Sequence, residues 1–130
     1  MLPETTKASG EPTEATIDGK GLTLNEVNSR IRKAVDSGLK VTLLNVEHLY
    51  GVADGLKSGE ITINSKVGDY VGLLNSGAKI TIEGDAGNFA GDNSWQGEIV
   101  VKGNAGYGAG IYSYGGTLVV YGNAGDAAGQ

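Results

Sequence analysis

The stretch of the chain that most resembles a chemical site is a glycine-rich loop, Gly103-Asn104-Ala105-Gly106-Tyr107-Gly108. Glycine-rich turns can cradle a phosphate, because their backbone N–H groups approach the anion without obstruction from side chains. A dinucleotide site also needs a helix whose N-terminus follows the loop and meets the phosphate. No helical pattern follows this loop, and its glycines recur at a fixed interval along the chain. The sequence therefore favours the corner of a repeat over a nucleotide site.

Other residues that could do chemistry are few and scattered. His48 is the only histidine, and no second histidine, aspartate or serine lies near it in sequence, so we interpret it as packed or exposed. Asp85, Asp92 and Asp126 do not keep the nine-residue period of calcium-binding β-helix repeats. The chain has no cysteine, which excludes thiol nucleophiles, zinc thiolate sites and iron–sulfur ligation by its own residues. We predict no catalytic residue, no metal site and no cofactor bound by this chain.

Composition narrows the class of partner. The net charge is −5, and the only basic cluster is Arg30, Arg32 and Lys33, which argues against nucleic-acid binding. No apolar run approaches the roughly 18 residues of a membrane span, and residues 1–16 lack the basic start and apolar core of a secretory signal. We therefore expect a cytoplasmic protein that contacts neither membrane nor nucleic acid.

The elements that position these residues follow a period of 19. The chain has 23 glycines among 130 residues, and 17 of them lie in the repeat between Gly59 and Gly129. Two glycine columns keep this step, namely Gly68, Gly87, Gly106 and Gly125, and then Gly72, Gly91, Gly110 and Gly129. Two apolar columns keep it as well, namely Ile61, Ile80, Ile99 and Leu118, and then Ile63, Ile82, Val101 and Val120. A small-residue column follows the same step, as Val67, Ala86, Ala105 and Ala124. Self-similarity at a fixed period is typical of a solenoid, in which neighbouring repeats bury each other's apolar face.

Each column has a predicted role in a stack of coils whose strands pair in parallel. The two apolar columns point inward, whereas Thr62 and Thr81, with the valines equivalent to them, point outward. The glycines supply positive φ at corners and allow successive coils to approach closely. Asp85, Asn104 and Asn123 stack at one corner, where Asx residues tolerate left-handed geometry and bond locally. The alanine column fits a tight interior.

The segment before the repeat predicts a short strand and one helix. Residues 15–18 favour a strand that ends at Gly19. Thr23 and Glu26 form a capping-box pattern that starts a helix at Leu24, and Gly38 is a plausible left-handed stop after Ser37. The apolar face of this helix holds Val27, Ile31, Ala34 and Val35, and its polar face holds Asn28, Arg30, Arg32, Lys33 and Asp36. That polar face is either a solvated surface or, through Arg30 and Arg32, a docking surface for an acidic partner.

The first coil is expected to be irregular. Residues 41–44 favour a strand by β-branching and alternation, and they precede Ile61 by slightly more than one repeat. Gly51 and Gly55 keep the spacing of Gly68 and Gly72, but they precede that pair by less than one full repeat, as in a degenerate terminal coil.

We predict an all-β fold, a right-handed parallel β-helix built as a single-stranded solenoid of 19-residue coils with an N-terminal capping α-helix. Residues 1–15 are expected to form a flexible or partner-binding arm, 16–40 the strand and capping helix, and 41–130 the β-helix. The helix would cover one open end of the stack, where unpaired strand edges invite aggregation. No capping element follows the last repeat, so we expect either a longer natural chain or a partner at that end.

Aromatic residues of the repeat also fall into columns. Tyr70 and Phe89 are 19 residues apart and are expected to stack. Ser76, Trp95 and Tyr114 are equivalent by the same period, with Tyr112 two residues before Tyr114. Two interpretations stay open for Trp95, Tyr112 and Tyr114. They either shield the flank of the solenoid or form an exposed patch for a protein partner, since aromatic residues are favoured at interfaces.

The repeated unit G-x-I-x-I-x-G-N-A-G-x-x-x-G, which runs through residues 41–129, resembles the GXGXG β-helix domain of the glutamate synthase large subunit. It is also similar to the stand-alone versions of that domain and to the GXGXG-type subunit of formylmethanofuran dehydrogenase. Glu26-Val27-Asn28 and Ile31-Arg32 in the predicted helix look like the opening of the stand-alone glutamate synthase versions. The motif is specific for the fold, because it recurs in register four times, and less specific for the enzyme complex.

This resemblance implies a non-catalytic structural subunit of an oxidoreductase complex for glutamate biosynthesis. Its partners would be a glutaminase-type and an FMN synthase-type subunit, and FMN and iron–sulfur clusters would reside on those partners. Two alternatives remain, a solenoid that self-assembles through its uncapped C-terminal coil as a homo-oligomer, and a subunit of a formylmethanofuran-dehydrogenase-like oxidoreductase.

Overall fold

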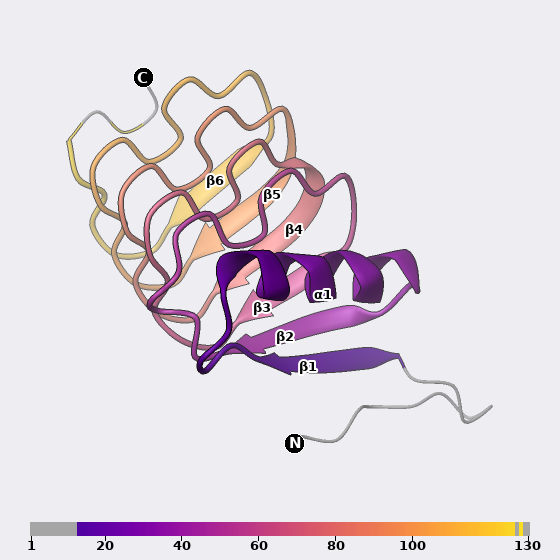
Figure 1. Cartoon of the computed structure of the whole chain (residues 1–130). Helices are drawn as coiled ribbons and strands as arrows, with labels where there is room; N and C mark the ends of the chain where they lie inside the picture. Colours follow the sequence, from indigo (N-terminus) through magenta and orange to yellow (C-terminus); the bar gives the residue numbers. More distant parts are fainter. Residues whose placement is uncertain (1–12, 127, 129–130) are drawn as a thin grey trace.

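A computed structural model of the chain describes residues 13–126 and residue 128. Its one described helix is α1 (Leu24–Asp36), and its strands are β1 (Glu14–Asp18), β2 (Lys40–Leu44), β3 (Glu60–Ile63), β4 (Ser76–Ile82), β5 (Gln96–Val101) and β6 (Thr117–Val120). The strands form one parallel sheet in chain order, and each strand lies one coil above the strand before it (Figure 1). The predicted parallel β-helix with 19-residue coils is confirmed.

The strand register follows the predicted columns. Ile61 pairs with Ile80, Ile80 with Ile99, and Ile99 with Leu118. The step from β2 to β3 is slightly longer than the regular repeat, because Val41 pairs with Ile61. The inward isoleucines at positions 61, 80 and 99 are at most 2% exposed, so alternation with a period of two places one continuous apolar layer inside the stack.

Helix α1 begins where the capping box predicts. Thr23 Oγ1 accepts the Glu26 N–H at 3.2 Å, and Glu26 Oε1 accepts the Thr23 N–H at 3.1 Å. The helix ends at Asp36, one residue earlier than predicted, and Gly38 follows with φ of 77°. Val27 and Ile31 are fully buried. An α-helix leaves four backbone N–H groups at its start without an intrahelical partner, and this motif satisfies two of them.

Asn28 corrects the predicted polar face of this helix. The side chain is 4% exposed rather than solvated. Its Oδ1 accepts the Ala53 N–H at 2.8 Å, and its Nδ2 donates to the Gly51 carbonyl at 3.0 Å. The pattern of polar residues could not separate Asn28 from its solvated neighbours, because both partners belong to a loop that is distant in the chain.

Helix α1 closes the interior of the stack at its N-terminal end. It lies against the wall of the first coil opposite the sheet, where Asn28 binds Gly51 and Ala53 (Figure 1). The capping role is confirmed, but α1 leaves the outer strand edge uncovered, because β1 pairs with β2 and is itself the edge of the sheet. Strand β1 also takes Glu14 and Ala15 from the predicted arm, whose residues 1–12 lie outside the described part.

The two glycine columns of the repeat have different roles. Gly72, Gly91 and Gly110 have φ between 68° and 72°, so they supply the predicted left-handed corner. Gly87, Gly106 and their equivalents are absent from the positive-φ positions. A Cβ on Gly87 would lie 2.8 Å from the Asp69 N atom, and one on Gly125 would lie 2.9 Å from the Gly106 carbonyl. The column that contains Gly87, Gly106 and Gly125 is therefore required for the close approach of successive coils. Gly129 lies outside the described residues.

Left-handed backbone recurs at alternate residues of each coil, and half of these positions are not glycine. Three columns share it, namely Gly51, Tyr70, Phe89 and Gly108, then Ala53, Gly72, Gly91 and Gly110, and then Gly55, Leu74, Asn93 and Tyr112. The assignment of Gly51 and Gly55 to the column of Gly68 and Gly72 is therefore wrong. The Gly51 N–H donates to Asp69 O, as the Tyr70 N–H donates to Asn88 O, so the loop of the first coil keeps the 19-residue period. One extra residue lies between β2 and Gly51, in the segment that contains left-handed Asn45.

Candidate functional site

The glycine-rich loop at residues 103–108 is a corner of the stack. All six of its N–H groups donate within the chain, to Gly84 O, Asp85 Oδ1, Asn123 O, Gly87 O, Asn88 Oδ1 and Asp126 O in turn. The next regular element is strand β6 rather than a helix. A phosphate would find no free amide here, so the geometry agrees with the interpretation of a repeat corner.

The stacked Asx residues act between coils rather than within one. Asp85 Oδ1 accepts the Asn104 N–H, and Asn104 Oδ1 accepts the Asn123 N–H, each at 2.8 Å. None of these three residues has positive φ, so the expected left-handed geometry and local bonding are wrong. The stacking itself is confirmed. The oxygen of each coil satisfies a backbone N–H of the next coil, which fixes the axial register of the corner.

A second column of the same kind was not predicted from the sequence. Asp69 Oδ1 accepts the Asn88 N–H at 2.8 Å, and Asn88 Oδ1 accepts the Tyr107 N–H at 2.9 Å. The signal was present as an Asp and an Asn separated by one repeat. Tyrosine continues the column at position 107 because the position requires only its backbone N–H.

The titratable side chains form no reactive cluster. His48 is exposed, and its Nε2 lies 3.1 Å from the Leu22 carbonyl. Hydrogen bonds from the Asn45 side chain and the Lys20 N–H lower the pKa of Asp18, whereas partial burial raises the pKa of Asp92. Over the described residues, no three His, Cys, Asp or Glu side chains are grouped as a metal site would require. The buried polar side chains found there are Asn28, Asn75 and Ser94, which are all uncharged.

Tyr70 and Phe89 stack as predicted, and the structure shows that Trp95 and Tyr114 stack as well. The rings of Tyr70 and Phe89 lie 5.1 Å apart and nearly parallel, and those of Trp95 and Tyr114 lie 4.4 Å apart at 18°. Trp95 is 55% exposed and Tyr114 68% exposed. Tyr112 is equally open to solvent. Exposed, stacked aromatic rings are a feature favoured at protein contacts.

The predicted basic contacts lie elsewhere on the stack. Arg30 and Arg32 are exposed on α1, which packs against the first coil, whereas Trp95 and Tyr114 belong to the last two coils. Arg32 also pairs with Asp54 at 3.6 Å. The structure therefore does not bring the basic and aromatic candidates together into one surface.

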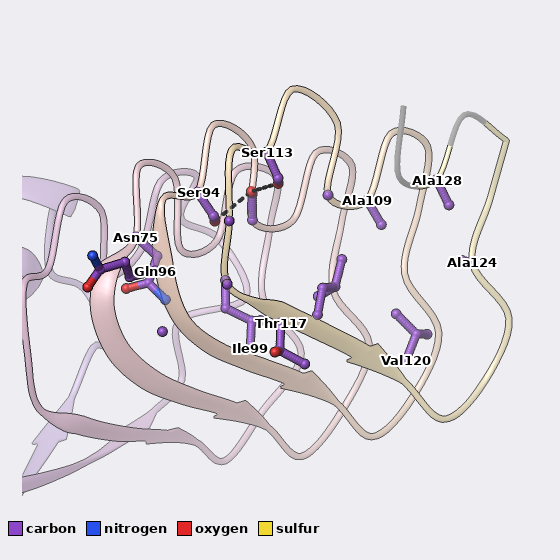
Figure 2. A pocket seen from close by; sticks show the side chains of 16 residues that line it. Asn75, Ser94, Gln96, Ile99, Ala109, Ser113, Thr117, Val120, Ala124 and Ala128 are labelled. Carbon is purple, nitrogen blue, oxygen red and sulfur yellow. Dashed lines mark hydrogen bonds between the residues drawn. The ribbon is translucent and has the colours of Figure 1, made fainter.

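One hollow is the interior of the stack seen from its C-terminal end (Figure 2). It measures about 480 Å³ and is lined mainly by small and apolar side chains, among them Ile99, Leu118, Val120, Ala109 and Ala124. The alanines equivalent to Ala124 in the coils below are buried, whereas Ala124 itself is exposed. Leu118 and Val120 are only half-buried. The hollow is therefore lined like the apolar interior of the coils below it rather than like a polar pocket.

Three polar side chains that line this hollow, Asn75, Ser94 and Ser113, are hydrogen-bonded within the chain. Ser94 Oγ donates to Gly91 O at 2.7 Å, and Ser113 Oγ donates to the same oxygen at 3.2 Å (Figure 2). Asn75 is equivalent by period and bonds both backbone groups of Ala78. This polar column was missed in the sequence, although its regular spacing could have revealed it.

Comparisons of the chain with protein-family models, with curated proteins and with solved structures find no match. The described helix is also neither long nor apolar enough to cross a membrane. The candidate site therefore rests on the geometry of the stack, which offers two surfaces, the aromatic flank and the C-terminal end.

Proposed function

We propose that this chain is a non-catalytic structural module of a glutamate-synthase-like complex, which holds a glutaminase-type and an FMN synthase-type partner in fixed relation. The resemblance of its repeated unit supports the choice of complex. FMN and iron–sulfur clusters belong to the partners in this proposal, and the complex is cytoplasmic.

The observation that supports a structural role is that the stack uses its polar groups internally. The six consecutive amides of the 103–108 loop are bonded within the chain, and the hollow at the C-terminal end is lined without a charged side chain. A stack built in this way keeps its shape through inter-coil hydrogen bonds and one apolar layer. It presents Trp95 and Tyr114 on its flank as a rigid aromatic pair, a feature favoured at protein contacts.

Affinity purification of the full chain from native extract tests this function. Recovery of a glutamine-hydrolysing protein together with an FMN-containing protein is the expected result. The variant Trp95→Ala/Tyr114→Ala should lose these partners, whereas Tyr50→Ala, which removes another exposed aromatic ring, should retain them. Purification of the chain without either partner would contradict the proposal.

A further inference from the structure

Asp92 is an unusual residue for its position in the repeat. The 19-residue step places it between Leu73 of the coil below and Ile111 of the coil above. The hydrogen bonds agree with this placement, because the Leu74 N–H donates to Asp92 O at 2.9 Å and the Asn93 N–H donates to Ile111 O at 3.2 Å. A half-buried carboxylate therefore stands between two apolar residues of its column.

No cation of the described residues neutralises this carboxylate. The ion pairs found among them involve Asp54, Glu60 and Glu83, and none involves Asp92. Its Oδ1 accepts a hydrogen bond from the uncharged side chain of Asn93 at 3.2 Å. Burial raises the pKa of Asp92, because desolvation disfavours a charge that lacks a partner. A charged group that the fold itself does not stabilise is suited to contact with another molecule.

The first coil shows what a carboxylate in this column takes. Asp54 occupies the same column two repeats before Asp92, and Arg32 of helix α1 pairs with it at 3.6 Å. The Arg32 side chain is 53% exposed and the Asp54 side chain 40% exposed, so this column reaches the surface of the stack. An arginine suits the position, because its guanidinium is always charged and pairs with a carboxylate through two N–H groups.

Apolar surface for the stem of an arginine lies beside Asp92. Leu74, whose N–H binds Asp92 O, is 46% exposed. Trp95 follows Asp92 by three residues in the same loop and is 55% exposed. An arginine buries its methylene stem on such a surface while its charged end stays free to pair. Described coils lie on both sides of these three residues, so they belong to the flank of the stack rather than to one of its ends.

We propose that Asp92, Leu74 and Trp95 form a site for an arginine side chain of the protein partner. The guanidinium pairs with the Asp92 carboxylate, and the stem lies on Leu74 and Trp95. This inference rests on the proposed function for the presence of a partner, and it adds the chemistry that the partner presents to the aromatic flank. Arginine and tryptophan are both enriched among the residues that dominate binding at protein interfaces.

A small probe tests this arginine site without any partner. N-acetyl-arginine amide is titrated into the full chain, and N-acetyl-citrulline amide, which has nearly the same shape without the charge, is the control. Trp95 is the only tryptophan of the chain, so its indole N–H gives one NMR signal. The arginine probe should shift this signal saturably. The citrulline probe should bind about tenfold more weakly or less, because it lacks the charge-assisted hydrogen bond.

The variant Asp92→Asn removes the charge with little change of shape. Its affinity for the arginine probe should fall by about tenfold or more. Glu98→Gln, which removes a charge of the same sign from strand β5, should keep the affinity of the parent chain. Because the pKa of Asp92 is raised, Asp92→Asn should be at least as stable as the parent at neutral pH. A loss of binding in this variant therefore cannot come from a loss of the fold.

Affinity purification from native extract separates this proposal from the proposed function. Asp92→Asn should recover about tenfold less of the partners than the parent chain, and Glu98→Gln should recover as much as the parent. A parent chain that purifies alone but binds the arginine probe through Asp92 would contradict the proposed function and support the arginine site. The proposal is overturned if both probes bind equally, or if Asp92→Asn retains the arginine probe or the partners at the level of the parent.

Discussion

The buried Asn28 holds the capping helix to the first coil, and its removal should destabilise the chain strongly. The variant Asn28→Ala leaves two backbone groups without partners, the Ala53 N–H and the Gly51 carbonyl. Ala53 is 1% exposed, so water cannot replace the lost bond there. An unsatisfied buried group costs about 1–3 kcal/mol. The free energy of unfolding should therefore fall by about 2–5 kcal/mol, because Gly51 and Ala53 are affected together.

Urea unfolding followed by circular dichroism measures this loss, with Ser29→Ala as the matched control. Ser29 is exposed on the same helix, and such a surface change should stay within about 0.5 kcal/mol. The first coil should also lose amide protection before the coils nearer β6, because neighbouring coils are coupled only through their interfaces. If Asn28→Ala and Ser29→Ala unfold at the same urea concentration, the assignment of Asn28 as the anchor of the cap is wrong.

Three further changes test the roles of single positions. Overpacking costs about 1–3 kcal/mol of stability, and Gly106→Ala should lose an amount toward the upper end of that range, because its Cβ would lie 3.1 Å from the Asn88 N atom. Gly55 has open space around it and φ of 64°, so Gly55→Ala should lose about 1 kcal/mol. Equal losses of the two variants in urea unfolding would contradict the two glycine roles. Burial raises the pKa of Asp92, so its ionisation lowers stability as pH rises above the ordinary aspartate range, and Asp92→Asn should unfold at higher urea concentration at neutral pH but not at acid pH. Hydrogen bonds from Thr23 lower the pKa of Glu26, so that contribution is present above the ordinary glutamate range and is lost as pH falls, and Glu26→Gln should flatten this acid-side loss in the same measurement.

The fold was predictable because the repeat constrains it twice. The 19-residue step aligns Ile61, Ile80 and Ile99 into one column, and alternation decides which face of each strand is buried. A one-residue slip would expose every inward isoleucine, so few alternatives fit the same pattern. The helix start was equally local, since the capping box lies within four consecutive residues.

What the sequence did not reveal depends on contacts between coils. Tyr70, Phe89 and Leu74 adopt left-handed backbone that no residue preference predicts for them. They do so because their N–H groups must reach carbonyls of the next coil, as Tyr70 reaches Asn88 O at 2.9 Å. At the candidate site, the equivalence of Trp95 and Tyr114 followed from their spacing, and the structure shows that their rings stack. The hollow at the C-terminal end did not, since its lining comes from several separate columns.

The inter-coil bonds give the stack a direction, and this explains why its two ends differ. Asp69, Asp85, Asn88 and Asn104 each turn a side-chain oxygen toward a backbone N–H of the next coil.

Near the N-terminal end of the described stack Asp18 Oδ1 differs, because it accepts from the Lys20 N–H and from the Asn45 side chain. Its acceptor is therefore satisfied within the chain, and α1 fills the core beside it. In the last described coil the Asn123 N–H donates to Asn104 Oδ1 at 2.8 Å, and Leu118 is half-buried. Each of these four bonds therefore runs from a backbone N–H of one coil to a side-chain oxygen of the coil before it, and this common direction fixes the axial register of the stack.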